Sequence, residues 1–404
     1  MSASAVGFGT RPVATVRARV RGLSRYERLV ALGFLLLGVV RVEPAPSDAL
    51  LAVAAVAWIG SRGFDLRRVP PAMLWTLVAL IALNLVSASQ AVDLGIGMRY
   101  LGITLNLFVL AIWLTTWATT PRRVRVVVGA YVAGAAVSAG IAILAALGAP
   151  LPGRSTLIGE GVRAQGLFKD PNVFGAFLIP AALIVLEELV RPRLFRLRGW
   201  AGAALLGLLV LGIVFAYSRA AWLDLGLALV VMLGVMTARA DAGPRVLVVL
   251  GLVLAVGAVA GATVALSGSA SVLRERAQAQ RYDTERFAAQ RSGIRLAEAH
   301  PLGIGPGQFE VVEPIASHSI YVRVLSEQGV LGLAALVALL GGTLLLAAQN
   351  ALLGRDTYGV GSAALLGAWC GLLANSAFID TLHWRHLWLV AALVWIAARR
   401  SPAR

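Results

Sequence analysis

The chain contains 404 residues, of which 59% are hydrophobic and only 14% are charged. That composition excludes a soluble globular domain and predicts an all-α polytopic membrane protein. The one cysteine, Cys370, lies in an apolar stretch, which excludes a disulfide framework and a cysteine-based metal site. The formal net charge of +16 comes from arginines scattered through short loops, so it favours membrane orientation over nucleic-acid binding.

The first part of the chain is basic and has no apolar core. Residues 1–28 therefore predict a cytoplasmic arm and not a cleavable signal peptide. Beyond this arm, about twelve apolar segments are long enough to cross the roughly 30 Å of hydrocarbon in a bilayer. They lie near residues 27–43, 48–62, 71–88, 96–118, 124–148, 172–190, 199–217, 220–238, 246–267, 318–347, 358–379 and 384–398. Residues 29–398 are expected to form one transmembrane domain, followed by a cytoplasmic tail at residues 399–404.

The arginines predict the orientation of these segments. With the N-terminus inside, every second connection is short and carries arginine, as the positive-inside rule requires. Both termini are therefore predicted to be cytoplasmic. The two long connections, residues 149–171 and 268–317, then fall on the outer side, and only the second is large enough to fold by itself. No internal repeat marks a second domain.

The first outer loop carries two basic residues that local structure does not explain. Asp170 and Pro171 are typical of a helix start, with aspartate as the cap and proline in the first turn. Arg163 and Lys169, a few residues earlier, have no such role in a helix start. We therefore consider both as candidates for a binding site.

A second outer site is the short turn AYSRAAW, residues 216–222. It places Arg219 at the outer membrane boundary, against the inward bias of the other arginines. Such a position costs a few kcal/mol if the side chain faces hydrocarbon. Arg219 is thus either part of an anion site or an arginine that snorkels to the interface.

The third outer site is a helix that is predicted to stop at His300–Pro301. Arg286 and Gln290 share one face of this helix with Ile294 and Ala297, whereas Arg291 and Arg295 lie on other faces. Arginines on those faces are expected to be solvated or paired with nearby carboxylates. Arg286 is therefore the main candidate of this segment.

The fourth site is His318, where a polar loop leads into a long apolar helix. Ser317 or Ser319 can cap this helix, which places His318 in its first turn. Gly329 and Gly332 follow on one helical face and predict the close approach of a neighbouring helix. A lone histidine here either caps and hydrogen-bonds at the interface or acts as a base. The rival bases in the sequence are Asp224, Asp170 and Glu310.

Several arginines close to one histidine are typical of an anion-binding site that also contains a base. The planar guanidinium fork suits phosphate oxygens and stays charged at any pH, so no metal is needed to neutralise a diphosphate. No acidic cluster stands nearby to hold a metal. His383 and His386 flank Arg385 next to two tryptophans, which is typical of an interfacial aromatic belt, with a metal site as the alternative.

These segments resemble the superfamily of O-antigen ligases and Wzy polymerases of the bacterial envelope. His318-Ser319, nine residues and then Gly329-Val-Leu-Gly332 match the ligase pattern H-[NSQ]-x9-G-x-x-G, although Leu333 stands where ligases carry Thr or Ser. The other matching segments are Arg163 to Gly175, Tyr217-Ser218-Arg219-Ala220, and Arg286 fourteen residues before His300, with Gln290 where family members often have Trp. All four segments follow the family order.

The resemblance implies a GT-C-like fold with one larger periplasmic loop region, in the bacterial inner membrane. It implies metal-independent, inverting transfer of a glycan from an undecaprenyl diphosphate donor to a lipid-linked or lipid A-core type acceptor, without a cofactor. His318 would be the general base, and Arg163, Arg219 and Arg286 would bind the diphosphate; Lys169, Arg291 and Tyr321 are secondary candidates. The site would face the periplasm.

Two other functions remain open. A Wzy-type polymerase would transfer the same donor glycan to another lipid-linked repeat unit. A transporter or flippase of lipid-linked sugars belongs to another class and usually has functional charges near the midplane and repeat symmetry. The charges here crowd one face of the predicted bundle, which favours an enzyme.

Overall fold

The computed structural model describes residues 22–159, 162–239, 243–266 and 281–399. Within these ranges the chain is helical, with isolated β-bridges only, at Ile158–Ala164 and Thr357–Val360. The all-α prediction is confirmed for this part of the chain. Most of the predicted basic arm, residues 268–280 of the long outer loop and almost all of the predicted tail lie outside the described residues.

Each of the twelve predicted apolar segments contains a helix. The helices are α1 (Arg25–Leu35), α2 (Pro46–Arg62), α3 (Pro71–Ala88), α4 (Leu94–Trp117), α5 (Pro121–Ala146), α6 (Pro171–Val190), α7 (Gly199–Phe215), α8 (Arg219–Ala238), α9 (Gly243–Leu266), α11 (Arg281–Ala299), α12 (Phe309–Val312), α13 (Ile320–Leu352), α14 (Ser362–Asn375) and α15 (Arg385–Ala398). In the described ranges, 6 helices are long and apolar enough to cross a membrane: α3, α4, α5, α6, α8 and α13. The twelve predicted segments are therefore confirmed as helical, but twelve membrane crossings are not confirmed.

Local chemistry explains where the helices begin. The side chains of Asp93, Thr120, Asp170 and Ser218 accept hydrogen bonds from the first turns of α4, α5, α6 and α8. Proline occupies the first turn of α2, α3, α5 and α6, where its missing N–H costs no hydrogen bond. The predicted Asp170–Pro171 helix start is confirmed.

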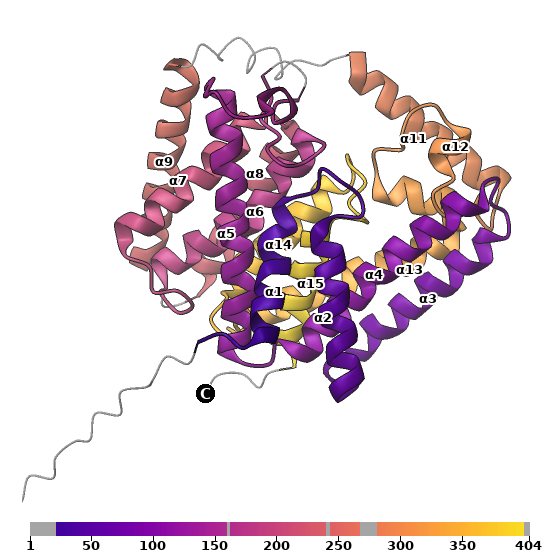
Figure 1. Cartoon of the computed structure of the whole chain (residues 1–404), viewed down its shortest axis with the longest axis horizontal. Helices are drawn as coiled ribbons and strands as arrows, with labels where there is room; N and C mark the ends of the chain where they lie inside the picture. Colours follow the sequence, from indigo (N-terminus) through magenta and orange to yellow (C-terminus); the bar gives the residue numbers. More distant parts are fainter. Residues whose placement is uncertain (1–21, 160–161, 240–242, 267–280, 400–404) are drawn as a thin grey trace, which may run out of the picture.

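The most buried helices lie in the middle of the bundle (Figure 1). The helices α6, α14 and α15 bury most of their residues. Two glycines let α14 approach α8 closely: a Cβ on Gly367 would lie 2.5 Å from the Ala228 carbonyl oxygen, and one on Gly371 would lie 2.0 Å from Asp224 Oδ1. Helix α8, which begins with Arg219, is therefore packed closely against α14.

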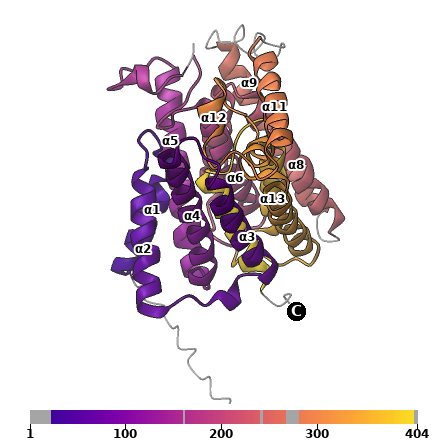
Figure 2. The same cartoon turned by 90° about the vertical axis from the view of Figure 1, so that its right-hand side faces the viewer.

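The two ends of the described chain lie at the lower end of the bundle in Figures 1 and 2, whereas α11 and α12 lie at the upper end. The start of α4 is tied to the loop before α12, because the Asp93 N–H donates to Gln308 Oε1 over 2.8 Å and Gln308 Nε2 donates to the Asp93 carbonyl over 2.9 Å. The start of α4 therefore lies next to the α12 region, at the end of the molecule opposite the two ends of the described chain.

The structure corrects the predicted role of the glycines in α13. Gly329 has φ 70° and ψ −172°, so it interrupts the helix instead of lying on a helical face. A Cβ there would lie 2.0 Å from the Pro301 carbonyl oxygen, and a Cβ on Gly303 would lie 2.3 Å from the Glu327 carbonyl oxygen. The loop that follows α11 therefore packs against the kink at Gly329, where a neighbouring helix was predicted.

Candidate functional site

His318 lies in an uncommon backbone conformation just before α13. Ser319 caps the helix, since its side chain accepts from the Val322 N–H, so His318 precedes the cap and is not in the first turn as predicted. Its φ is 49°, in the left-handed region that residues other than glycine seldom adopt. Such strain persists only where the surroundings hold it, and it clusters at functional sites.

Hydrogen bonds of His318 and of the residues around it hold this conformation. The Ile320 N–H donates to the Ser376 carbonyl oxygen over 3.1 Å, at the end of α14. The side-chain amide of Gln290 donates to the carbonyl oxygens of His318 and Ala377, over 3.4 and 3.3 Å. His318 is therefore fixed between α11 and the end of α14.

The surroundings of His318 favour its neutral form. Burial lowers the pKa of His318 to about 4, and the positive charges of Arg286 and Arg323 act in the same direction, against the opposing charge of Asp380. A neutral imidazole at physiological pH has a lone pair that can accept a proton. The largest cause is desolvation, with the charges of the neighbouring arginines second.

Arg219 and Arg286 line the same cavity although 67 positions separate them in the chain (286 − 219 = 67). The cavity has a volume of about 430 Å³ and is also lined by Phe287, Gln290 and Phe378. We call it the Arg219–Arg286 cavity. Among the described residues, its lining contains two guanidinium groups and no carboxylate. Arginine forks in such a setting can bind phosphate oxygens through paired hydrogen bonds.

Arg163 has a different environment. It is buried, its Nε donates to the Ala216 carbonyl over 3.1 Å, and its Nη2 donates to Asn172 Oδ1 over 2.8 Å. The next residue, Ala164, donates its N–H to the Phe215 carbonyl over 2.8 Å. Arg163 therefore contacts the connection between α7 and α8 directly ahead of Arg219, and it is not among the lining residues of the Arg219–Arg286 cavity.

The secondary candidates are spread over other surroundings. Lys169 lies 3.4 Å from a carboxylate oxygen of Glu43 and lines a separate cavity of about 180 Å³ with Asp380. Arg291 is exposed on α11. The hydroxyl of Tyr321 donates to the Leu373 carbonyl over 3.1 Å. None of the three lines the Arg219–Arg286 cavity.

The rival bases have local roles. Asp170 caps α6, and Glu310 forms an ion pair with Arg323. Asp224 is buried where α8 meets α14, and its Oδ2 accepts from Asn375 Nδ2 over 3.1 Å. Of the four candidates, His318 alone combines a strained backbone with a neighbouring arginine from the cavity lining.

A buried arginine organises the site and was missed by the sequence analysis. Arg323 forms ion pairs with Glu310, with Glu327 over 3.1 Å and with Asp380 over 2.7 Å, and its guanidinium lies 5.6 Å from the centre of the Tyr100 ring. Arg323 and Glu327 are four positions apart on a predicted helix, a spacing that could have revealed the pair. Asp380 carries no comparable signal because its partner is distant in sequence.

Glu327 connects this ion-pair cluster to the loop after α11. Its carboxylate accepts from the N–H groups of Gly307 and Phe309 over 2.8 and 3.1 Å. The loop in turn occupies the space that the kink at Gly329 opens. The glycine-rich segment is thus part of the frame that holds the start of α13.

The two histidines of the α14–α15 region lie among aromatic side chains, His386 buried and His383 half-buried. His383 Nε2 lies 2.9 Å from the Thr104 hydroxyl, and its ring lies 5.3 Å from that of Tyr100. His386 packs against Trp384 at 5.0 Å between ring centres. No group of three or more potential metal ligands occurs among the residues that the structure describes.

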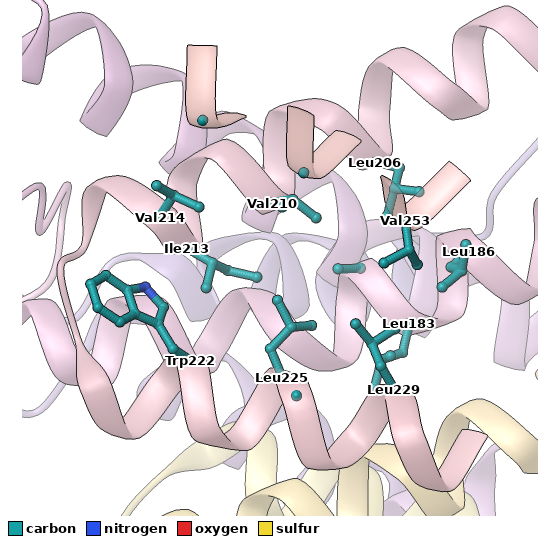
Figure 3. A pocket seen from close by; sticks show the side chains of 14 residues that line it. Leu183, Leu186, Leu206, Val210, Ile213, Val214, Trp222, Leu225, Leu229 and Val253 are labelled. Carbon is teal, nitrogen blue, oxygen red and sulfur yellow. The ribbon is translucent and has the colours of Figure 1, made fainter. Parts of the chain in front are cut away.

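A largely apolar cavity is lined by another set of α8 residues (Figure 3). It has a volume of about 450 Å³ and lies between α6, α7, α8 and α9. Trp222, Leu225 and Leu229 of α8 line it, whereas Arg219 and Leu223 of α8 line the Arg219–Arg286 cavity, so the two cavities lie on different faces near the start of this helix. A molecule with a phosphate head and an apolar tail would find both environments along α8.

Residues 203–337 match the family model described as O-antigen ligase. No curated protein is significantly similar to the chain. The matched residues run from α7 into α13 and include Arg219, Arg286 and His318, whereas Arg163 precedes them. The match confirms the resemblance to the superfamily of O-antigen ligases and Wzy polymerases. It supports a multi-pass membrane protein that transfers glycosyl groups, with lipid-linked polysaccharide substrates.

Proposed function

We propose that this chain, with its O-antigen ligase match, moves a glycan from undecaprenyl diphosphate to an acceptor hydroxyl at the outer face of the bacterial inner membrane. The observation that carries the proposal is the convergence of Arg219 and Arg286 on one cavity beside a neutral His318. The fold is proposed to be GT-C-like, and transfer is proposed to need no metal.

The two arginines are proposed to bind the diphosphate of the donor. Two guanidinium groups are the charged groups among the described lining residues, which suits an anion. When the bond between the anomeric carbon and the diphosphate breaks, negative charge grows on the leaving oxygen. Guanidinium groups held in place before the reaction stabilise this charge more than water would.

The isoprenoid tail of the donor must remain in an apolar environment. The apolar cavity begins one helical turn from Arg219 and is open to such a chain. Because α8 contributes to both cavities, head and tail can be bound along one helix. This arrangement favours a lipid-linked donor over a soluble sugar nucleotide.

His318 is proposed to be the general base. It takes the proton of the acceptor hydroxyl while the oxygen attacks the anomeric carbon from the face opposite the diphosphate, so the configuration inverts. The electron pair of the broken bond leaves with the diphosphate. The imidazolium that forms is stabilised by the negative charge of Asp380, which acts on His318 in that direction.

Arg163 is proposed to act through Arg219. The resemblance assigns it to the diphosphate, but its guanidinium donates to Ala216 and Asn172. Those contacts fix the turn between α7 and α8, and the first residue of α8 is Arg219. A positioning role explains both its burial and its place in the motif.

The test uses purified protein in liposomes with a labelled undecaprenyl diphosphate oligosaccharide and an extract of host envelope lipids. His318→Ala should abolish glycan transfer while donor binding stays within about twofold, because the base acts only in the chemical step. Arg295→Gln, an exposed change on α11, serves as the control. Transfer by His318→Ala at the wild-type rate would refute the base assignment.

The product distinguishes the ligase from the polymerase. A single block moved to a new acceptor indicates a ligase, whereas a ladder of lengthening lipid-linked chains indicates a polymerase. Leu333, which stands where ligases carry Thr or Ser, is the feature that keeps the polymerase as the second candidate. Movement of intact donor across the bilayer without a new glycosidic bond would indicate a flippase.

A further inference from the structure

A further polar cavity lies beside the first half of α4. It has a volume of about 650 Å³ and is lined by α4, the start of α2 and the α14–α15 loop. We call it the Arg99–His383 cavity. Among the described residues, neither the Arg99 guanidinium nor the Asn106 amide makes a side-chain hydrogen bond or ion pair. Both groups are therefore available to a ligand.

The charges of this cavity are balanced. Glu43 and Asp48 line it together with Arg99 and Arg385. Asp48 pairs with Arg385 at 2.6 Å, and Glu43 lies 3.4 Å from Lys169. In the Arg219–Arg286 cavity, in contrast, the charged side chains among the described lining residues are both arginines. A balanced polar lining does not require an anion. An apolar chain would leave its polar groups without partners, at a cost in free energy.

His383 offers a hydrogen-bond acceptor in the wall. The Thr104 hydroxyl donates to the Tyr100 carbonyl over 3.0 Å, so its oxygen accepts from His383 Nε2–H over 2.9 Å. This assignment leaves Nδ1 of His383 as an acceptor. Burial lowers the pKa of His383 to about 4, which keeps the ring neutral. The adjoining Tyr100 ring adds an apolar face.

Donors, acceptors and an aromatic face of this kind match a hydroxyl-rich ligand. Each sugar hydroxyl both donates and accepts a hydrogen bond, and the C–H groups of a sugar ring form an apolar surface. Arg99 and Asn106 can donate, and His383 can accept. A neutral oligosaccharide is the class of molecule that satisfies all of these groups together.

The α14–α15 loop, residues 376–384, links this cavity to the Arg219–Arg286 cavity. Phe378 lines the Arg219–Arg286 cavity, whereas His383 lines the Arg99–His383 cavity. Between them, Asp380 pairs with Arg323, whose guanidinium lies over Tyr100 in the wall of the Arg99–His383 cavity.

His318 is tied to the start of the same loop. The residue pair Ile320–Ser376 joins the two segments through a backbone hydrogen bond of 3.1 Å. The charges of Arg323 and Asp380 also act on the imidazole of His318. The base thus stands beside the loop that connects both cavities.

We propose that the Arg99–His383 cavity binds the sugar residues of the acceptor and presents one of their hydroxyls to His318. This inference rests on the proposed glycosyl transfer and adds the acceptor site to it. Donor and acceptor would then approach the base from separate cavities joined by one loop.

Gly102 allows a direct test, because it lines the cavity and a Cβ there meets no atom within 4 Å. Gly102→Trp fills the cavity without a clash at the Cβ. Gly140→Trp on α5, where a Cβ also meets nothing within 4 Å, is the matched control. Arg99→Gln, an exposed position, is the second variant if Gly102→Trp does not fold.

Binding to the full chain in nanodiscs is measured with two probes, so that turnover is not required. One is the oligosaccharide released by mild acid from the host's envelope glycolipid, and the other is undecaprenyl diphosphate without sugar. Gly102→Trp and Arg99→Gln should weaken oligosaccharide binding by about tenfold and leave undecaprenyl diphosphate binding unchanged. Gly140→Trp should change neither.

Wild-type affinity for the oligosaccharide in both cavity variants would overturn the proposal, as would failure of the wild type to bind it. A third probe is the glycan-bearing donor. If Gly102→Trp weakens this donor but not the bare carrier, the cavity holds the donor glycan and the acceptor assignment is wrong. Absence of transfer alongside normal oligosaccharide binding would refute the proposed function alone.

Discussion

One amide, that of Gln290, connects the helix of Arg286 to the backbone of His318. Its Nε2 donates to the His318 carbonyl over 3.4 Å and to the Ala377 carbonyl over 3.3 Å. Arg286 lies one turn earlier on the same helix. Gln290 therefore fixes the helix of Arg286, which is proposed to bind the diphosphate, relative to His318, which is proposed to take the proton.

Removing this connection should slow the chemical step more than it weakens donor binding. Gln290→Ala deletes both hydrogen bonds, and one such bond is worth about 1 kcal/mol, or about fivefold in rate. We expect kcat to fall about five- to tenfold with a smaller change in donor KM. Steady-state kinetics in liposomes measure the split. An unchanged kcat would show that His318 keeps its position without Gln290.

The pH profile should report the lowered pKa of His318. The base is active when deprotonated, so kcat/KM should stay level near neutrality and fall as the pH drops through about 4. Arg286→Gln removes a positive neighbour, which makes the imidazolium less costly and raises its pKa. The acid limb should then move toward the ordinary value near 6.5. A wild-type limb already at that value would contradict the burial of His318.

Arg219→Lys separates charge from geometry in the proposed diphosphate site. Lysine keeps the positive charge but loses the planar fork that binds two oxygens at once. We expect donor KM to rise at least about tenfold, since a charge-assisted hydrogen bond is worth about 1.5–3 kcal/mol. The same exchange at exposed Arg295 is the control. Near-normal donor KM would mean that Arg219 only snorkels to the interface.

Arg163→Lys tests the positioning role in a different way. It should lose the paired contacts with Ala216 and Asn172 and so loosen the turn that carries Arg219. Thermal unfolding in detergent should begin at a lower temperature, together with a rise in donor KM. In the double variant with Arg219→Lys the two effects on KM should not add, because both act through one group. Full additivity would support direct contact of Arg163 with the donor.

The kink at Gly329 should be intolerant of any side chain. Gly329→Ala places a Cβ against the Pro301 carbonyl and imposes a left-handed conformation on alanine, at a cost of about 1–3 kcal/mol from backbone strain alone. Gly341→Ala in the same helix meets nothing within 4 Å and should be neutral or stabilising. Melting temperatures of the two variants compare them directly; equal values would show that the kink is not required.

The sequence by itself determined the helices and the order of the motifs. Apolar runs and caps such as Asp170 act over a few residues, so the segments predicted from them contain the helices that the structure shows. The family resemblance likewise depends on local patterns around Arg219, Arg286 and His318. These features need no knowledge of how distant segments pack.

Only the tertiary structure decided which charges meet. Arg163 donates a hydrogen bond to Ala216, and a loop instead of a helix packs against Gly329. Arg323 forms ion pairs with carboxylates of α12, α13 and the α14–α15 loop. Each of these outcomes depends on chain segments that are distant in sequence and are brought together by burial of their apolar faces. A pattern of spacing along the chain does not contain that information, because the contacts are set by packing between helices.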